Sequence, residues 1–301
     1  MTAPGDVRRS ARQEAERTLW RLVEAFHAVV YFAPQRSEVY SRLGLRGGWM
    51  GYFASRSAAL GVVPPDVVTA CFYGFAPRMV HRALPDAWRR TTPEQVLDAR
   101  LSVVDRAVRP HLEAAVRDGE VDPVALERVV EQLTQVVGTC SPAGAPLFAA
   151  HRALARPDEP HLALFWAATA LRELHGDAHV SALRAAGLGP VGSNVLMVAL
   201  GRVPTDHRLY RGWTEEEWGA AAAELTTLGW LQDGHVTPSG RRRRAAVEDT
   251  TDAITAPAWA GLEDDPLTRL VDDVASVVRP VVAGCGLPYP NGTGVLRALS
   301  P

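Results

Sequence analysis

Helical periodicity runs through almost the whole of this chain, whereas strand patterns are confined to one short stretch. Apolar side chains recur at three- and four-residue spacing, as in Leu19, Leu22, Val23 and Phe26, and prolines and glycines divide the pattern into segments of helix length. Such a pattern predicts a mostly α-helical protein. In the first half of the chain the predicted helices lie at 10–32, 38–43, 49–60, 64–75, 92–109 and 123–137.

The C-terminal third has the order helix, helix, helix, hairpin, helix, which is typical of a winged helix-turn-helix. Asp177 can cap the first of these helices, and Thr214 and Glu217 have the capping-box spacing at the start of the third. The strands flank an Asp-Gly turn. The predicted elements lie at 177–183, 193–200, 214–228, 230–237 and 240–252. We therefore expect an N-terminal helical domain and a C-terminal winged helix-turn-helix with a short β-hairpin wing.

Two stretches rich in proline and small residues, 139–146 and 155–160, indicate where the chain divides. The predicted organisation has four parts. These are a flexible N-terminus at 1–15, a helical domain at 16–150, a winged-helix-like domain at 160–260, and a C-terminal helix and tail at 261–301.

Several short stretches resemble known families. "LTTLGWLQDGHVTPSG" followed by "VEDTTD" is similar to the DNA-contacting helix and wing of regulators of the multiple-antibiotic-resistance (MarR) type. "YFAP", "SRSAALG", "FYGFAP", "LPDAW", "LRELHGDAHVSAL" and "RGW" resemble an actinobacterial helix-turn-helix family labelled SalK-like. That family's pattern near residue 174 is arginine-glutamate-histidine-arginine-glycine-aspartate, whereas this chain has Leu174 and His175 at the middle positions. The resemblance implies a fold but no particular chemistry.

The helix expected to enter the DNA groove has the wrong charge for that task. Residues 214–229 contain four glutamates and no basic residue, so the helix offers little to replace the counterions of the phosphate backbone. The alternative interpretation relies on Arg241, Arg242, Arg243 and Arg244, which follow the wing and could contact phosphate. Because of the charge of this helix we do not expect DNA binding. A winged helix can equally serve as a packing module or as the surface of a homodimer.

The densest polar group lies at residues 172–179. His175 and His179 are four residues apart, as two ligands on one helical face would be, but the Gly-Asp pair between them is expected to break the helix. Three interpretations stay open at this point: a helix cap at Asp177 beside an Arg172–Glu173 pair, a polar ligand or catalytic site, and a metal site that lacks a third ligand. No metal is predicted.

A second polar group lies in the N-terminal half. His27 and Tyr31 are four residues apart on an apolar helical face, and Arg56 stands in a stretch of small and apolar residues. A buried arginine needs a carboxylate or a bound anion, so Arg56 should either pair internally, with Glu24 as the candidate partner, or hold a ligand. The many aromatic residues nearby are typical of a core, and also of a pocket for an aromatic or amphipathic small molecule.

Composition excludes several mechanisms. The chain contains no lysine, so Schiff-base chemistry, pyridoxal phosphate held by a lysine and a P-loop nucleotide site are ruled out. The G-x-S-x-G and G-x-G-x-x-G patterns are also missing, and no cofactor is predicted.

The three cysteines are far apart, and no apolar run is long enough to cross a membrane. The first residues are charged and unlike a signal peptide, and the net charge of −2 favours neither nucleic acid nor a membrane surface. We expect a cytoplasmic protein.

Two function hypotheses follow. The first is a small-molecule-binding protein, or an enzyme of specialised metabolism, whose winged helix does not bind DNA. Its proposed catalytic residues are His179 and His27, and its proposed ligand-binding residues are Tyr31, Arg56, Arg172, His175 and Asp177. The alternative is a MarR-like regulator that responds to a ligand.

Overall fold

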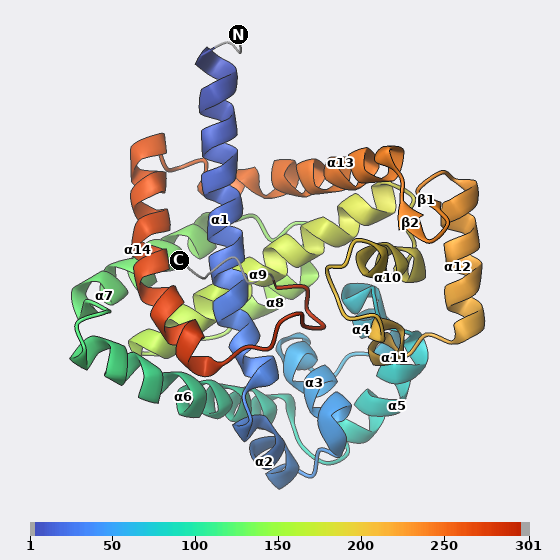
Figure 1. The fold of residues 1–301 in the computed structure, drawn as a ribbon. Helices are drawn as coiled ribbons and strands as arrows, with labels where there is room; N and C mark the ends of the chain where they lie inside the picture. The colour runs from blue at the N-terminus through green and yellow to red at the C-terminus, as the bar shows by residue number, and fades with distance from the viewer. Residues whose placement is uncertain (1–3, 296–301) are drawn as a thin grey trace.

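The computed structural model describes residues 4–295, with side chains from residue 11 onward. Within this range the chain forms fourteen α-helices, two short 3-10 turns and one antiparallel hairpin, which confirms a mostly helical fold (Figure 1). The helices of the first half are α1 (Pro4–Phe32), α2 (Gln35–Arg42), α3 (Gly47–Ser57), α4 (Pro65–Phe72), α5 (Pro77–Ala87), α6 (Pro93–Arg117), α7 (Pro123–Thr139) and α8 (Pro146–Arg152).

The second half begins with a long central helix and contains the hairpin. Its elements are α9 (Pro160–Ala185), α10 (Pro190–Ala199), α11 (His207–Arg211), α12 (Glu215–Thr227), β1 (Leu231–Gln232), β2 (His235–Val236), α13 (Pro238–Thr255) and α14 (Asp264–Cys285). Among these described helices, none combines the length and the apolar character that crossing a membrane requires.

Local capping explains most helix starts. Proline is the first residue of helices α4 to α10 and of α13, where its missing N–H has no intrahelical partner to lose. Thr214 and Glu217 form the predicted capping box of α12, and Thr92 forms another with Gln95 at α6. Eight of the ten predicted helix starts lie within three residues of the observed ones, whereas α1 begins six residues and α9 seventeen residues earlier than expected. Helix α6 ends eight residues later than expected, and α5, α8 and α11 were not predicted.

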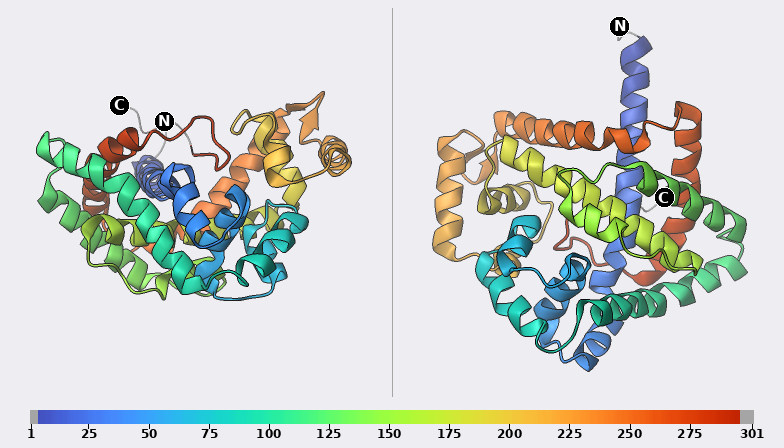
Figure 2. Two further views of the ribbon diagram at one scale, coloured as in Figure 1. Left: turned by 90° about the horizontal axis from the view of Figure 1, so that it is seen from below. Right: turned by 180° about the vertical axis from the view of Figure 1, so that it is seen from behind.

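Helix α9 organises the molecule because it packs against α1, α6, α7, α8 and α13 (Figures 1 and 2). At 26 residues it is about 39 Å long. Its first half, up to Leu171, lies in the main hydrophobic core, which also contains α1, α6, α7 and α14. Its last turn, with Ala182 and Leu183, lies in a smaller core under the winged helix. The polar stretch 172–179 therefore lies where the two cores meet.

The winged helix forms in the predicted order, with the short α11 added between its second and third helices. Leu231 pairs with Val236 and Gln232 with His235 across the Asp-Gly turn. The start of the wing lies directly against α13, so close that a Cβ atom built on Gly240 would collide with the backbone oxygen of Trp230. Only glycine permits this approach.

The predicted helix break at Gly176-Asp177 was wrong. Helix α9 continues through both residues, because packing along its length outweighs the low helix propensity of one glycine, about 1 kcal/mol. Asp177 does cap a helix, but a different one. Its Oδ2 accepts hydrogen bonds from the backbone N–H groups of Leu147 (3.0 Å) and Phe148 (3.1 Å) in the first turn of α8.

Candidate functional site

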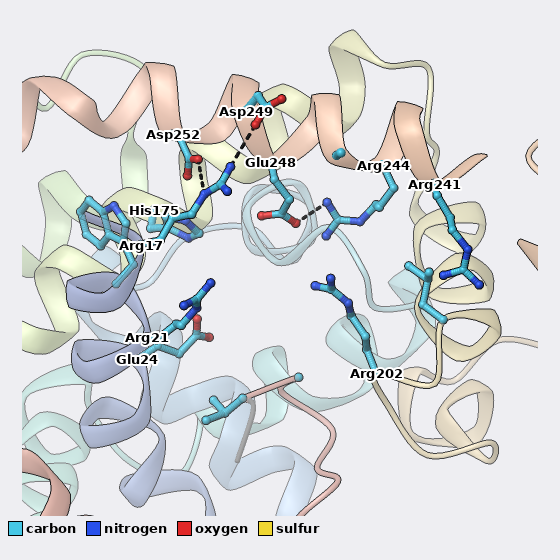
Figure 3. Close-up of a pocket in the computed structure, with 15 residues that line it drawn as sticks. Arg17, Arg21, Glu24, His175, Arg202, Arg241, Arg244, Glu248, Asp249 and Asp252 are labelled. Atoms are coloured by element: carbon cyan, nitrogen blue, oxygen red, sulfur yellow. Dashed lines mark hydrogen bonds and ion pairs between the residues drawn. The ribbon is translucent and has the colours of Figure 1, made fainter. Parts of the chain in front are cut away.

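A cleft lined with arginines opens between α1, α9, α13 and the loop after α10 (Figure 3). Its outer part has a volume of about 480 Å³. Arginine side chains reach it from opposite walls: two from α1, two from α13 and one from the loop. They are Arg17, Arg21, Arg241, Arg244 and Arg202.

The cleft continues inward as a second cavity of about 300 Å³, which shares Glu24, His175 and Arg202 with the outer part. This inner part adds Arg56, Arg172, Arg211 and His179 to the lining. Together the two parts are lined by eight arginines and by four carboxylates, those of Glu24, Glu248, Asp249 and Asp252. We call the whole space the arginine cleft.

The far end of the arginine cleft is aromatic. A third cavity, of about 480 Å³, shares Tyr31, Tyr52 and Arg211 with the inner part and is walled by Trp49 and Phe75. The rings of Tyr52 and Phe75 lie 5.5 Å apart, and Trp49 meets Phe75 edge-on at 5.7 Å. The aromatic residues singled out in the sequence thus include both core residues, such as the fully buried Phe53, and the walls of a pocket.

Arg56 is buried and ion-paired, as its apolar surroundings require, but its partner is Glu173 and not Glu24. Its Nε and Nη2 atoms donate to the two carboxylate oxygens of Glu173, each at 2.9 Å. Arg172 Nη1 donates to the same carboxylate at 2.9 Å, and its Nε lies 3.7 Å from Glu24. Burial alone would raise the pKa of Glu173, yet the facing guanidinium groups of Arg56 and Arg172 hold it well below its usual range.

Arg211, on α11, stands against the aromatic end of the arginine cleft. Its guanidinium lies 4.2 Å from the centre of the Phe75 ring, and its Nη2 donates to the backbone oxygen of Gly292. Within the described residues no carboxylate pairs with it. Burial lowers the pKa of Arg211 to about 10, and repulsion by Arg56 and Arg172 acts in the same direction. A bound anion would relieve this uncompensated charge.

His175 and His179 both line the inner cleft, on one face of the unbroken α9. Their rings are stacked with centres 6.4 Å apart. The hydroxyl group of Thr251 donates to the backbone oxygen of Val247, so it accepts from Nδ1 of His179 at 3.0 Å. This arrangement places the proton of the neutral ring on Nδ1 and leaves a lone pair on Nε2. Burial lowers the pKa of His179 to about 4, which keeps the ring neutral at pH 7.

His27 and Asp177 lie away from the arginine cleft. His27 is 1% exposed, and its ring nitrogens contact the hydroxyl groups of Thr169 and Tyr31, each at 3.0 Å. It therefore reaches the cleft only through Tyr31, whose ring lines the inner and aromatic parts. Asp177 points to α8, as described above. The structure thus brings together Tyr31, Arg56, Arg172, His175 and His179, and leaves His27 and Asp177 behind them.

The four consecutive arginines of α13 divide into two pairs. Arg241 and Arg244 line the arginine cleft, and Arg244 forms an ion pair with Glu248. Arg243 instead points to the wing, where its Nη1 donates to the backbone oxygen of Leu228 at 2.8 Å, and Arg242 is exposed. Two of the four side chains that could contact DNA phosphate are therefore turned toward the cleft.

Sequence reasoning missed Arg17, Arg21, Arg202 and Arg211. All four are arginines in helices or loops with no distinguishing local pattern, and tertiary packing alone brings them to one cleft. The one available indication was the "RGW" stretch that carries Arg211, which was used only as a family resemblance.

The two stacked histidines have no third metal ligand beside them among the described residues. In residues 11–295 no group of three histidine, cysteine, aspartate or glutamate side chains is placed to hold an ion. The three cysteines are unpaired thiols. The cleft offers guanidinium donors, aromatic faces and the imidazole rings of His175 and His179, which suit an organic anion.

Fold and cleft together define a class: a mostly helical protein in which a winged helix-turn-helix closes one side of a cationic cleft. A Helix-turn-helix family matches residues 16–288, and the chain belongs to this family. No curated protein and no solved structure matches the chain.

Proposed function

We propose that this protein binds a small organic anion with an aromatic or apolar body in the arginine cleft. The observation that carries the proposal is the charge imbalance of the cleft: eight arginines face four carboxylates in its outer and inner lining. Glu173, buried beneath Arg56 and Arg172, adds only one further negative charge. Uncompensated charge is expensive to hold out of water, so a bound anion would stabilise this arrangement.

Arg211 supports a defined position for the anionic group. It lies at the junction of the inner cleft and the aromatic end, without a carboxylate partner among the described residues. An anion bound to Arg211 would place the rest of its molecule beside Trp49, Tyr52 and Phe75. Ligand pockets of a few hundred Å³ with apolar walls and few polar groups are typical of small-molecule sites.

His179 gives the arginine cleft one hydrogen-bond acceptor. Its Nε2 lone pair can accept from a ligand hydroxyl or amine, or take a proton as a general base. With a pKa of about 4 the ring carries no second proton to donate at neutral pH, so it suits the role of an acceptor better than that of an acid. With a ligand that carries a proton of suitable acidity, His179 would act as the general base, and the proposal then extends to an enzyme of specialised metabolism.

The winged helix acts in this proposal as a wall and not as a DNA reader. Helix α12 exposes Glu215, Glu216 and Glu224 and has no basic residue. Its first turn is held to α5 by Arg78, whose guanidinium contacts both carboxylate oxygens of Glu217 at 3.0 and 2.6 Å. A helix that is anionic and docked at its N-terminus is poorly suited to enter a DNA groove.

The four arginines of α13 allow a matched test. Thermal-shift screening of aromatic carboxylates, aryl phosphates and their neutral amides on the full chain should give stabilisation by anions only. Replacing Arg241 and Arg244 by glutamine, or Arg211 alone, should weaken the best anion at least about tenfold. Replacing Arg242 and Arg243 by glutamine removes the same charge and should leave affinity unchanged. Equal stabilisation by anions and amides would overturn the proposal.

The second candidate is a MarR-like regulator that releases DNA when it binds a ligand. The observation that favours it is the helix order together with the exposed Arg242 and the wing-facing Arg243. A mobility shift with DNA from its own promoter, abolished by glutamine at Arg242 and Arg243 and retained with glutamine at Arg241 and Arg244, would establish this function. Absence of any shift at low salt would exclude it.

A further inference from the structure

A pocket separate from the arginine cleft lies between α6, α8 and α9. It has a volume of about 300 Å³ and mostly apolar walls, formed by side chains such as Leu97, Leu101, Phe165 and Trp166. It shares no lining residue with the arginine cleft. A space of this size is at the lower end of small-molecule sites, so any occupant would be small.

Arg100 lines this pocket with a buried and incompletely paired guanidinium. The residue is 2% exposed, and Nη1 donates to the backbone oxygen of Ser55 at 2.8 Å. Its Nε and Nη2 atoms have no hydrogen-bond partner within the described part of the chain. The guanidinium rests over the Phe165 ring at 5.3 Å and the Tyr31 ring at 5.7 Å, which orients it but leaves its charge unpaired.

The unpaired edge of Arg100 has the geometry that binds a carboxylate. Arg56 in the same protein uses the same two atoms, Nε and Nη2, to hold both oxygens of Glu173 at 2.9 Å. Such bidentate pairs are stronger than single hydrogen bonds and specific for planar anions. Among the ion pairs of the described residues, the one fully buried carboxylate near Arg100, Arg56 and Arg172 is that of Glu173. This carboxylate pairs with Arg56 and Arg172.

Two further polar groups of the pocket lack partners. His151 is 3% exposed, and its Nε2 has no hydrogen-bond partner among the described residues. The indole N–H of Trp166 also has no hydrogen-bond partner among these residues. The ring of His151 bonds the backbone oxygen of Arg56, so in its neutral form Nε2 carries a lone pair. The pocket thus has apolar walls, with a cationic edge, one donor and one acceptor buried directly behind them, which a ligand would reach by displacing lining side chains.

We propose that this pocket is a second binding site, separate from the arginine cleft, for a small monocarboxylic acid with an apolar or aromatic body. The carboxylate lies on Nε and Nη2 of Arg100. The apolar body packs between Leu97, Leu101 and Phe165, and a hydroxyl group on the ligand, where one is present, donates to Nε2 of His151.

Calorimetric titration of the full chain with hexanoate and phenylacetate tests this site, with hexanamide and phenylacetamide as neutral counterparts. At least one carboxylate should bind saturably, and its amide should bind about tenfold more weakly or not at all. Arg100→Gln should abolish the difference. Ala155→Trp fills the exposed rim of the pocket without altering the core and should abolish binding, whereas Ala186→Trp, an equally exposed change elsewhere, should not.

The cleft variant Arg211→Gln separates the two sites. Carboxylate binding that survives Arg211→Gln and is lost in Ala155→Trp supports the second site. Binding that is lost in Arg211→Gln and survives Ala155→Trp places the carboxylate in the arginine cleft and overturns the inference. If neither acid binds saturably, the inference is overturned as well. Since Ala155 is exposed, its variant keeps the test valid even if Arg100→Gln folds poorly.

Discussion

Removal of the buried carboxylate beneath the arginine cleft should severely destabilise the protein. Glu173 is 0% exposed and is the shared partner of Arg56 and Arg172, at three distances of 2.9 Å. The variant Glu173→Gln keeps the shape but leaves Arg56, 7% exposed, without its counter-charge. Breaking a buried pair on one side typically costs about 3–5 kcal/mol. We expect a loss of this size in the free energy of unfolding.

Urea denaturation followed by circular dichroism at pH 7 measures this loss. The matched control is Glu38→Gln, which removes a carboxylate that also meets two arginines, Arg42 and Arg106, but at the surface. Little change is expected there. The double variant Arg56→Met with Glu173→Leu should recover part of the loss, because it leaves one buried charge fewer. Wild-type stability in Glu173→Gln would refute the assigned role of this carboxylate.

The pH dependence gives the same prediction a second test. The pKa of Glu173 is held well below its usual value of 4.5 in the folded protein, so the unfolded chain takes up the proton first as the pH falls. Its contribution to stability is fully present above about pH 4.5 and is lost below it. The gap in unfolding free energy between wild type and Glu173→Gln should therefore narrow as the pH drops below 4.5. A gap independent of pH would contradict the ion pair.

Three further predictions concern stability and use the same unfolding assay. Gly240→Ala should lower the free energy of unfolding by about 1–3 kcal/mol, because the new Cβ would meet the backbone oxygen of Trp230. The control Gly219→Ala, in open space on α12, should raise it by up to about 1 kcal/mol. Equal effects of the two substitutions would contradict the close wing contact. Asp177→Ala should lower the free energy of unfolding by about 1–2 kcal/mol, because it removes the cap on α8. It should leave the anion affinity of the arginine cleft unchanged. A loss of affinity would show that Asp177 belongs to the binding site. Burial lowers the pKa of His151 to about 4, so this residue alone should cost about 3 kcal/mol of stability as the pH falls from 6.5 to 4. His151→Gln should remove this share of the slope and leave the share of His179, whose pKa burial also lowers to about 4.

The sequence by itself determined the class of fold and the position of most helix starts. The capping box of Thr214 and Glu217, the proline starts and the Asp-Gly turn act over two to four residues, so they can be recognised without knowing what surrounds them. The sequence also indicated that a buried Arg56 would need an anionic partner. The division into domains at 16–150 and 160–260 stays a prediction, while the main core also includes α14 from the far end of the chain.

Tertiary structure alone decided what the polar residues do. Arg56 and Glu173 are 117 residues apart, and the cleft arginines come from five helices and a loop, so no local pattern could have grouped them. The break expected at Gly176-Asp177 did not occur, because the propensity of a single glycine is small beside the packing of α9 against five other helices. Helix starts depend on neighbouring backbone groups, whereas the pairing of charges depends on which buried surfaces meet, and only the folded chain brings those surfaces together.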